Sequence, residues 1–223
     1  MGKKAGEPAT ARGRISRQRA LSAAIALADK DGIGSVSMRR IAQELGIEAM
    51  SLYHHVANKE DVLDGMVDQV FAEIELPADG TEWKTAMRQR AESAREAMIR
   101  HPWAISLLGS RSAPGPATVR HHNAVLGSCR AAGFSIHMAA HAFSLIDSYV
   151  YGFVLQEVNL PFDESADLDE VVDSMMLPFS AEDYPHLLEL TTEIILQPGY
   201  SYGDEFAYGL DRVLDSLEAA ARG

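Results

Sequence analysis

The 223-residue chain lacks several features, and each absence excludes a class of protein. Because Cys129 is its single cysteine, no internal disulfide can form, and a reduced, cytoplasmic setting is expected. Cys129 itself lies among small residues and is expected to be a buried, unreactive side chain. No apolar run approaches the length of a membrane span, so no membrane partner is predicted. The basic N-terminus is followed by no apolar stretch, which argues against a signal peptide.

The sequence also lacks the common catalytic and strand-forming patterns. It has no serine nucleophile elbow, no phosphate-binding glycine loop and no HExxH zinc motif. Beyond Gly80, no run rich in Val, Ile and Thr competes with helical periodicity. The predictions are therefore an all-α fold, no enzymatic activity, no catalytic residue and no cofactor.

Charge is distributed unevenly along the chain. The net charge is −12, which by itself argues against binding to nucleic acid. However, residues 1–60 contain ten basic and six acidic residues, a net charge of +4, whereas the remainder carries −16. A basic module on an acidic body is predicted, and only the basic module could approach a DNA duplex.

Residues 36–59 have the pattern of two short helices joined by a tight turn. Ser37 is a suitable N-cap, and apolar residues then recur at i, i+3, i+4 and i+7 from Met38 to Leu45. Gly46 follows, where a helix end favours positive φ. A second helix is predicted from Glu48 to about His55. Its outer face lacks the Glu and Lys of a solvated helix and consists of Ala49, Met50, Ser51, Tyr53, His54 and His55.

A helix-turn-helix has small or groove-shaped side chains where its second helix meets base edges, and groups that hold phosphates further along. A plain helical hairpin within a bundle would satisfy the same apolar pattern. The other expected helices lie at residues 16–31, 58–74, 83–100, 118–132, 135–157, 181–196 and 204–222. The chain is therefore predicted to have three parts: a flexible basic tail at residues 1–14, a helix-turn-helix domain with a linking helix at 15–75, and a larger helical domain at 76–223.

This order of parts resembles the tetracycline repressor (TetR) family of transcriptional regulators. The resemblance rests on G-x-x-x-x-S-M-R-R-I-A-x-E-L-G-I at residues 32–47 and S-L-Y-H-H-V-x-N-K-E-D-V-L at residues 51–63. The body is similar to a tetracycline-repressor-like C-terminal domain through Pro77, Trp83, LGSR at 108–111 and AGF at 132–134. The resemblance implies a homodimeric, ligand-responsive DNA-binding regulator, usually a repressor released from its double-stranded operator by a small molecule.

Carried over by position, Arg39 is expected to contact a base or a phosphate, and Ala49 and Met50 are expected to meet base edges. Met50 departs from the family's Gln-Pro type of pair, so the operator sequence does not transfer. The phosphate contacts are expected from Ser51, Tyr53, His55 and Lys59, and Ser37, Arg40 and His54 complete the predicted DNA-binding set. The alternatives are that Tyr53 only covers the hairpin core and that Arg39 pairs with Glu44 or Asp31.

The resemblance also implies a ligand pocket between the helices at residues 83–100, 118–132 and 135–157. The predicted lining is Met87, Trp103, Leu107, His121, Asn123, Phe143, Asp147 and Tyr151, although each could simply be a core residue. Leu107 occupies the place of the family's magnesium-binding histidine, so neither tetracycline nor magnesium is predicted to bind. His137 and His141 have the i, i+4 spacing of a metal pair, but ordinary histidines are the favoured interpretation and no metal site is predicted.

The helix at 135–157 and the last helix are expected to supply the dimer face. Two alternatives to a regulator remain open at this stage: an all-α enzyme in which the hairpin is structural, and a small-molecule carrier that has lost DNA binding.

Overall fold

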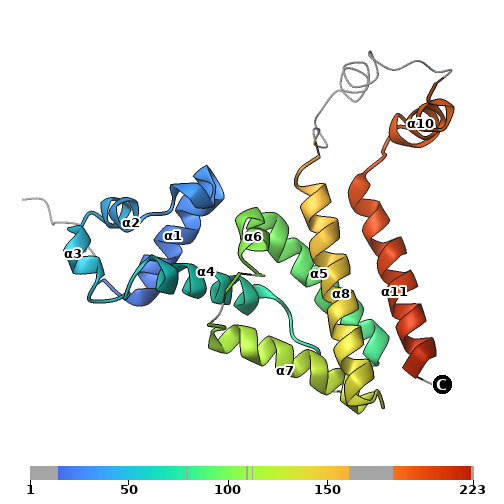
Figure 1. The fold of residues 1–223 in the computed structure, drawn as a ribbon, viewed down its shortest axis with the longest axis horizontal. Coiled ribbons are helices and arrows are strands. Elements are labelled where there is room, and N and C mark those ends of the chain that lie inside the picture. The colour runs from blue at the N-terminus through green and yellow to red at the C-terminus, as the bar shows by residue number, and fades with distance from the viewer. Residues whose placement is uncertain (1–14, 79, 109, 112, 161–182, 222–223) are drawn as a thin grey trace, which may run out of the picture. The chain divides into compact units, whose positions relative to one another are not determined.

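A computed structural model of the chain describes residues 15–160 and 183–221, except residues 79, 109 and 112 (Figure 1). Every regular element within these ranges is helical, which confirms the all-α prediction. The predicted basic tail at residues 1–14 lies outside the described residues. The chain divides into two compact units, one up to Val67 and the other from Asp68 onward.

The first unit contains the helices predicted for the hairpin and its neighbours. They are α1 (Arg17–Asp31), the short 3₁₀ helix η1 (Ile33–Ser35), α2 (Met38–Leu45), α3 (Ala49–Leu52) and the first part of α4 (Lys59–Glu73). Ser16 caps α1 by accepting a hydrogen bond from the Arg19 backbone N–H at 3.3 Å. The predicted bounds of α1 and α2 are therefore confirmed to within one residue.

The core of the first unit is built from small and aliphatic side chains. Ala20, Ala24, Ile41, Leu52 and Val62 are all fully buried. Gly65 on α4 is needed for close packing, because a Cβ there would lie 2.8 Å from the terminal carbons of Leu21 on α1. The helices α1, α2 and α4 therefore form a compact support for α3.

The second unit contains the remaining helices. They are α5 (Trp83–Arg100), η2 (Pro102–Ala104), α6 (Ile105–Leu108), α7 (Pro116–Ala131), α8 (Ile136–Glu157), α10 (Pro185–Leu190), the π-helix η3 (Thr191–Ile195), η4 (Tyr202–Asp204) and α11 (Glu205–Ala221). The α7 helix begins two residues earlier than predicted because Pro116 suits the first helical position, where no backbone N–H is needed.

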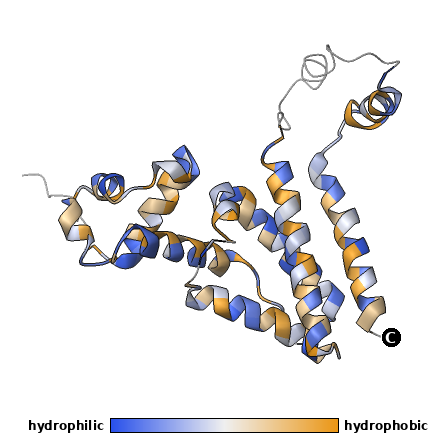
Figure 2. Cartoon of the chain, in the orientation of Figure 1, coloured by the Kyte–Doolittle hydropathy of each residue, from blue (hydrophilic) through white to orange (hydrophobic). Residues whose placement is uncertain are grey.

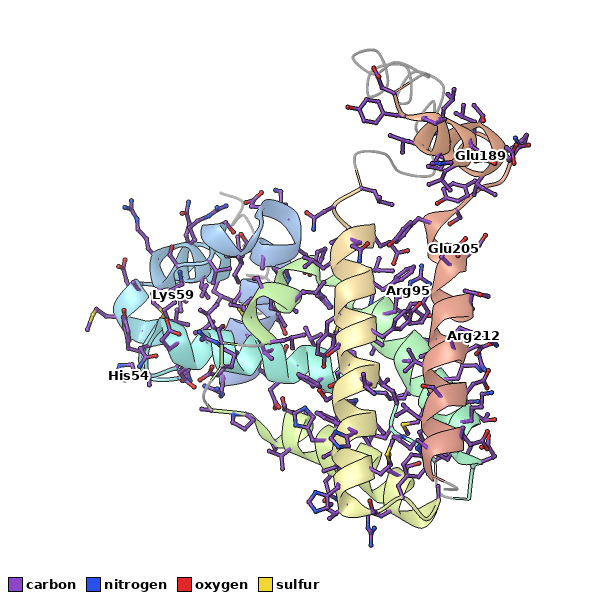
Figure 3. All side chains as sticks on the ribbon, turned by 45° about the vertical axis from the view of Figure 1, so that its right-hand side comes forward. His54, Lys59, Arg95, Glu189, Glu205 and Arg212 are labelled. Atoms are coloured by element: carbon purple, nitrogen blue, oxygen red, sulfur yellow. The ribbon has the colours of Figure 1, made fainter. Side chains whose placement is uncertain are left out.

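Helix α8 packs against α5, α7 and α11, and the last of these runs beside it (Figure 1). Orange and blue residues alternate along α11 (Figure 2), whose buried seam comprises Phe206, Leu210, Leu214 and Leu217. The ion pairs Lys84–Asp215 and Arg88–Asp211 join α5 to α11 with decreasing numbers on α11, so the two helices are antiparallel. Figure 3 shows Arg95 in the region between α8 and α11, where it pairs with Glu157.

One sequence expectation, that no apolar run approaches the length of a membrane span, needs correction at α8. It is the one helix among the described residues that is long and apolar enough, by length and composition, to cross a membrane. Such a helix is also typical of a protein core, and its position 147 carries a buried aspartate. One side of α8 is open in the single chain, because Ile136, Leu145, Ser148 and Leu155 are exposed. An exposed stripe therefore remains available on α8.

Candidate functional site

The turn between α2 and α3 forms as the sequence predicts. The Ser37 hydroxyl accepts the Arg40 backbone N–H at 3.3 Å and caps α2. Gly46 ends the helix with φ 65° and ψ 37°, the left-handed conformation that favours glycine. Because Ser37 caps through its oxygen lone pair, its hydroxyl proton stays free to donate to a phosphate.

The second hairpin helix is shorter than predicted. It covers only Ala49–Leu52, and not Glu48 to His55. After Leu52 the backbone tightens, since His54 and His55 donate to carbonyls three residues earlier. Tyr53 and the two histidines all have below-average helix propensity, which favours ending the helix here. The tighter turn places Val56 in the core beside Leu52, at 2% and 0% exposure.

The outer face of α3 and the turn after it is solvent-accessible. Met50 is 75% exposed and Tyr53 46% exposed, so both residues are accessible to solvent. Figure 3 shows the His54 and Lys59 side chains of the first unit. The residues of this surface are Ala49, Met50, Ser51, Tyr53, His54, His55 and Lys59, of which Ala49 and His55 are half-buried and the others exposed.

The two arginines of α2 differ in their partners. Arg40 makes an ion pair with Asp31 at 2.6 Å, so part of its charge is already neutralised. Arg39 is exposed and makes no ion pair among the described residues. Since Asp31 is occupied by Arg40, the Arg39 guanidinium keeps its planar set of donors available for a guanine edge or a phosphate.

Lys59 is positioned by a capped helix start. Asn58 accepts the Asp61 backbone N–H at 2.9 Å, and the Asp61 carboxylate accepts the Ala57 N–H at 2.8 Å. The Arg17 guanidinium also donates to Asp61, and this hydrogen bond is the main reason that the pKa of Asp61 lies below its usual value. These hydrogen bonds cap the start of α4 and fix Lys59 in its first turn.

The second candidate site lies within the second unit and centres on a residue that the sequence analysis missed. Arg90, on α5, is only 1% exposed. Its Nε donates to His121 Nε2 on α7 at 2.9 Å, and its Nη1 lies 2.6 Å from Asp147 Oδ1 on α8. The Tyr151 hydroxyl donates to the other Asp147 oxygen at 3.1 Å. Three of the predicted pocket residues are thus brought together by Arg90, and we call these four residues the Arg90 cluster.

Aromatic rings flank the Arg90 cluster. The Phe71 ring on α4 lies 5.2 Å from the His121 ring and 5.6 Å from the His122 ring. The Phe143 ring on α8 lies 5.0 Å from His122 on its other side. Met87 is fully buried on α5, one helical turn before Arg90. The flanking residues contribute apolar and aromatic surface around the charged centre.

The other predicted pocket residues lie elsewhere or contribute differently. Trp103 is buried with its ring 5.9 Å from that of His101, and Leu107 is half-buried on α6.

Asn123 faces away from His121, because residues two positions apart on a helix point in directions that differ by about 200°. It lines a separate cavity of about 780 Å³, together with Pro77, Trp83, Gly127, Ser128, Phe134 and Glu218. Beside that cavity, the buried Cys129 sulfur accepts the Trp83 indole N–H, and burial raises the pKa of the thiol, as expected for an unreactive cysteine.

Burial keeps His121 neutral. Desolvation, followed by the nearby charges of Arg90 and His122, lowers the pKa of His121 to about 3. Because His121 Nε2 accepts the Arg90 hydrogen bond, the ring hydrogen of the neutral form must be on Nδ1. Desolvation also raises the pKa of Tyr151, which keeps its proton.

Replacing His121 with Gln is expected to reduce the acid sensitivity of the fold. The unfolded histidine titrates near 6.5 and the folded one near 3, so the stabilising contribution is complete above pH 6.5 and is lost as the pH falls toward 3. Each pH unit in that window costs at most about 1.4 kcal/mol. Urea unfolding at about pH 7.5 and about pH 5.5 should show a smaller difference for His121→Gln than for the wild type, by about 1 kcal/mol.

The control for this experiment is His137→Gln, which changes an exposed histidine in the same unit. It should lose as much stability in acid as the wild type does. Equal losses in the wild type and His121→Gln would show that the charge state of His121 is not coupled to folding.

The second unit also ties α4 to α7. The Asp68 carboxylate accepts the Thr118 backbone N–H at 2.8 Å and the Thr118 hydroxyl at 2.9 Å. A Cβ at Gly115 would lie 2.2 Å from the Asp68 carboxyl carbon, so only glycine leaves room for this contact. Asp68 lies on α4 (Lys59–Glu73), so these contacts join that helix to α7.

Two family models match the chain. The model described as "Bacterial regulatory proteins, tetR family" matches residues 20–66, and "Tetracyclin repressor-like, C-terminal domain" matches residues 76–221. An HTH-type transcriptional regulator from Saccharopolyspora erythraea is 35% identical over 64% of this chain, and the match covers 61% of that relative's length. The transcriptional repressor DrrR1 from Streptomyces coeruleorubidus is 31% identical over 92% of this chain and 77% of its own.

Solved structures agree with the fold. Apo ActR from Streptomyces coelicolor superposes with a TM-score of 0.75 at 24% identity, covering 96% of this chain and 98% of its own. ActR in complex with actinorhodin gives a TM-score of 0.74 at 25% identity, covering 94% and 99%. The chain therefore shares its fold with ActR.

Proposed function

The chain belongs to the tetR family of bacterial regulatory proteins, and from that membership we propose that it is a cytoplasmic transcriptional repressor released from DNA by a small molecule. Residues 15–75 are proposed to form the DNA-binding domain with its linking helix, and residues 76–223 the effector-binding and dimerisation domain. The observation that carries the proposal is the accessible surface of α3 and its following turn, on the basic part of an acidic chain. Its relatives are transcriptional regulators, and no catalytic role is proposed for the Arg90 cluster.

DNA binding is proposed to use two copies of this surface. Arg39, Ala49 and Met50 would meet base edges, while Ser51, Tyr53 and Lys59 would hold phosphates. In a homodimer the two α3 helices must lie about 34–36 Å apart to enter successive major grooves. The acidic second unit repels the duplex, which favours approach through the first unit.

Release is proposed to work by population shift. An effector that binds more tightly to a conformer with wrongly spaced α3 helices lowers operator affinity by that difference in binding. Phe71 contacts the rings of His121 and His122, and Asp68 is hydrogen-bonded to Thr118. Both contacts join the C-terminal half of α4 to α7, so an effector at the Arg90 cluster could reposition α4.

A mobility-shift assay with the DNA upstream of the protein's own gene tests the proposal. A discrete retarded complex at nanomolar protein, competed by unlabelled specific DNA, is the expected result. If the protein retards that DNA no better than unrelated DNA of equal length, then this upstream region holds no operator and the repressor assignment loses its support.

The exposed stripe on α8 is proposed to be part of the dimer face, together with α11. Small side chains on this stripe, at Ala140, Ser144 and Ser148, are accessible and permit close helix approach. Replacing Ser148 with Arg places a long charged side chain there. The expected result is a dimer dissociation constant raised about tenfold or more, because overpacking costs about 1–3 kcal/mol.

Light scattering coupled to size-exclusion chromatography, over a range of protein concentrations, measures this change. Glu96→Arg adds the same side chain at an exposed position of α5 and should leave the dimer intact. If Ser148→Arg dimerises as tightly as the wild type, the dimer face lies elsewhere.

A further inference from the structure

Two buried nitrogen donors in the Arg90 cluster have no hydrogen bond of good geometry to an acceptor among the described residues. They are Arg90 Nη2 and His121 Nδ1. Arg90 Nη1 and Asp147 Oδ1 also lack a hydrogen bond of good geometry, although they form an ion pair at 2.6 Å. Buried polar groups are almost always satisfied by protein, water or ligand. This concentration of unsatisfied atoms in one place therefore marks a position where a further molecule is expected.

Apart from Asp147 Oδ1, which is ion-paired with Arg90, the unsatisfied atoms of the cluster are hydrogen-bond donors. Arg90 has donors only, and His121 Nδ1 carries the ring hydrogen because Nε2 already accepts from Arg90. The Asp147 carboxylate is already engaged by Arg90 and by the Tyr151 hydroxyl. The free hydrogen-bonding capacity thus calls for a partner that supplies acceptor oxygens, and it disfavours a cation beside the buried guanidinium.

The side chains around these donors indicate what the rest of the bound molecule is like. The rings of Phe71, His122 and Phe143 follow one another at centroid separations of 5.6 and 5.0 Å. Rings in offset or edge-to-face contact suit a further flat aromatic ring. Burial lowers the pKa of His122, which favours the neutral form of this ring.

We propose that the effector is a planar aromatic molecule that presents a carboxylate or carbonyl oxygen to Arg90 Nη2 and His121 Nδ1. This inference rests on the proposed function, since it names the effector class for the same regulator. The aromatic body lies against Phe71, His122 and Phe143. Through Phe71 the ligand contacts α4 directly, which links occupancy of the site to the helix that begins in the first unit.

Three probes with the same naphthalene ring test the inference: 2-naphthoate, 2-acetylnaphthalene and 2-(aminomethyl)naphthalene. Isothermal titration calorimetry with the full-length protein should detect the carboxylate, the ketone or both with a dissociation constant below about 1 mM. The cationic probe should bind at least about tenfold more weakly. The relative affinities of the first two probes tell a charged acceptor from a neutral one.

Arg90→Lys is the informative variant because it keeps the buried positive charge opposite Asp147 but loses the planar fork of donors. The variant should bind the tighter of the two acceptor probes about tenfold more weakly than the wild type does. Its circular dichroism spectrum and dimer size should match those of the wild type. Ser106→Ala, in the same unit, is the matched control and should bind all probes as the wild type does. If Arg90→Lys does not fold, His121→Phe provides the same test at Nδ1.

The inference is overturned if neither acceptor probe binds, if the cationic probe binds as tightly, or if both variants bind the acceptor probes normally. Operator binding, measured separately without probe, distinguishes this failure from failure of the proposed function. A protein that binds its operator but none of the acceptor probes is a regulator with another effector class. A protein that binds the probes but no DNA is not the proposed repressor.

Discussion

Replacing Arg39 and Lys59 together with Gln is expected to weaken operator binding by about 100-fold or more at physiological salt. An arginine that grips a base edge contributes about 1–3 kcal/mol of discrimination, and a lysine on a phosphate contributes through release of counterions. Both side chains are exposed, and Arg39 has no ion-pair partner among the described residues. Neither change removes a contact that the fold depends on, so the loss should appear in binding and not in stability.

The two single variants should fail in different ways. Arg39→Gln should reduce the preference for operator over unrelated DNA. Lys59→Gln should weaken both kinds of DNA similarly and reduce the slope of log affinity against log salt by about one. Lys30→Gln, which removes an exposed lysine from the end of α1, is the matched control and should change little. Operator binding by the double variant at wild-type strength would show that the assigned DNA surface is wrong.

Replacing Asp147 with Leu is expected to destabilise the protein by about 3–5 kcal/mol. The substitution leaves the buried Arg90 guanidinium without its carboxylate partner, and an uncompensated buried charge carries a cost of this size. The Tyr151 hydroxyl loses its acceptor at the same time. Urea unfolding at one fixed protein concentration measures the effect, since dimer stability depends on concentration.

Two further variants test whether the loss of stability comes from the unpaired buried charge of Arg90. The double variant Arg90→Met, Asp147→Leu removes both charges and should recover most of the lost stability, because apolar replacement of a buried ion pair is often neutral. Asp211→Leu breaks the half-exposed pair with Arg88 and should cost only about 0–1 kcal/mol. If Asp147→Leu costs no more than Asp211→Leu, the Arg90–Asp147 pair is not an important buried interaction.

Local chemistry in the sequence was sufficient to predict much of the fold. Ser37 and Gly46 each specify a helix end, one through its side chain and the other through its backbone preference, and the structure has both in the predicted role. The apolar residues of α4 and α11 likewise follow from helical periodicity. The end of α3 did not, because whether Tyr53 and the following histidines extend the helix depends on Val56 reaching the core.

The effector site shows the same division between local and tertiary information. Helical spacing from Trp83 through Met87 places Arg90 on the buried face of α5, so its burial could have been predicted. Its partners could not, because His121 and Asp147 lie on two other helices and no sequence spacing relates them. The sequence also does not show which donors lack an acceptor, because that depends on the hydrogen-bond geometry of the packed side chains.

Selection of DNA ligands from a random library by the purified full-length protein tests the central claim most directly. The expected result is strong enrichment of a two-fold symmetric sequence whose half-site centres lie about 10 base pairs, or a multiple of one helical turn, apart. The Arg39→Gln, Lys59→Gln variant should enrich nothing similar. If the wild type enriches no sequence beyond that variant, the chain is not a sequence-specific DNA-binding regulator, whatever its fold.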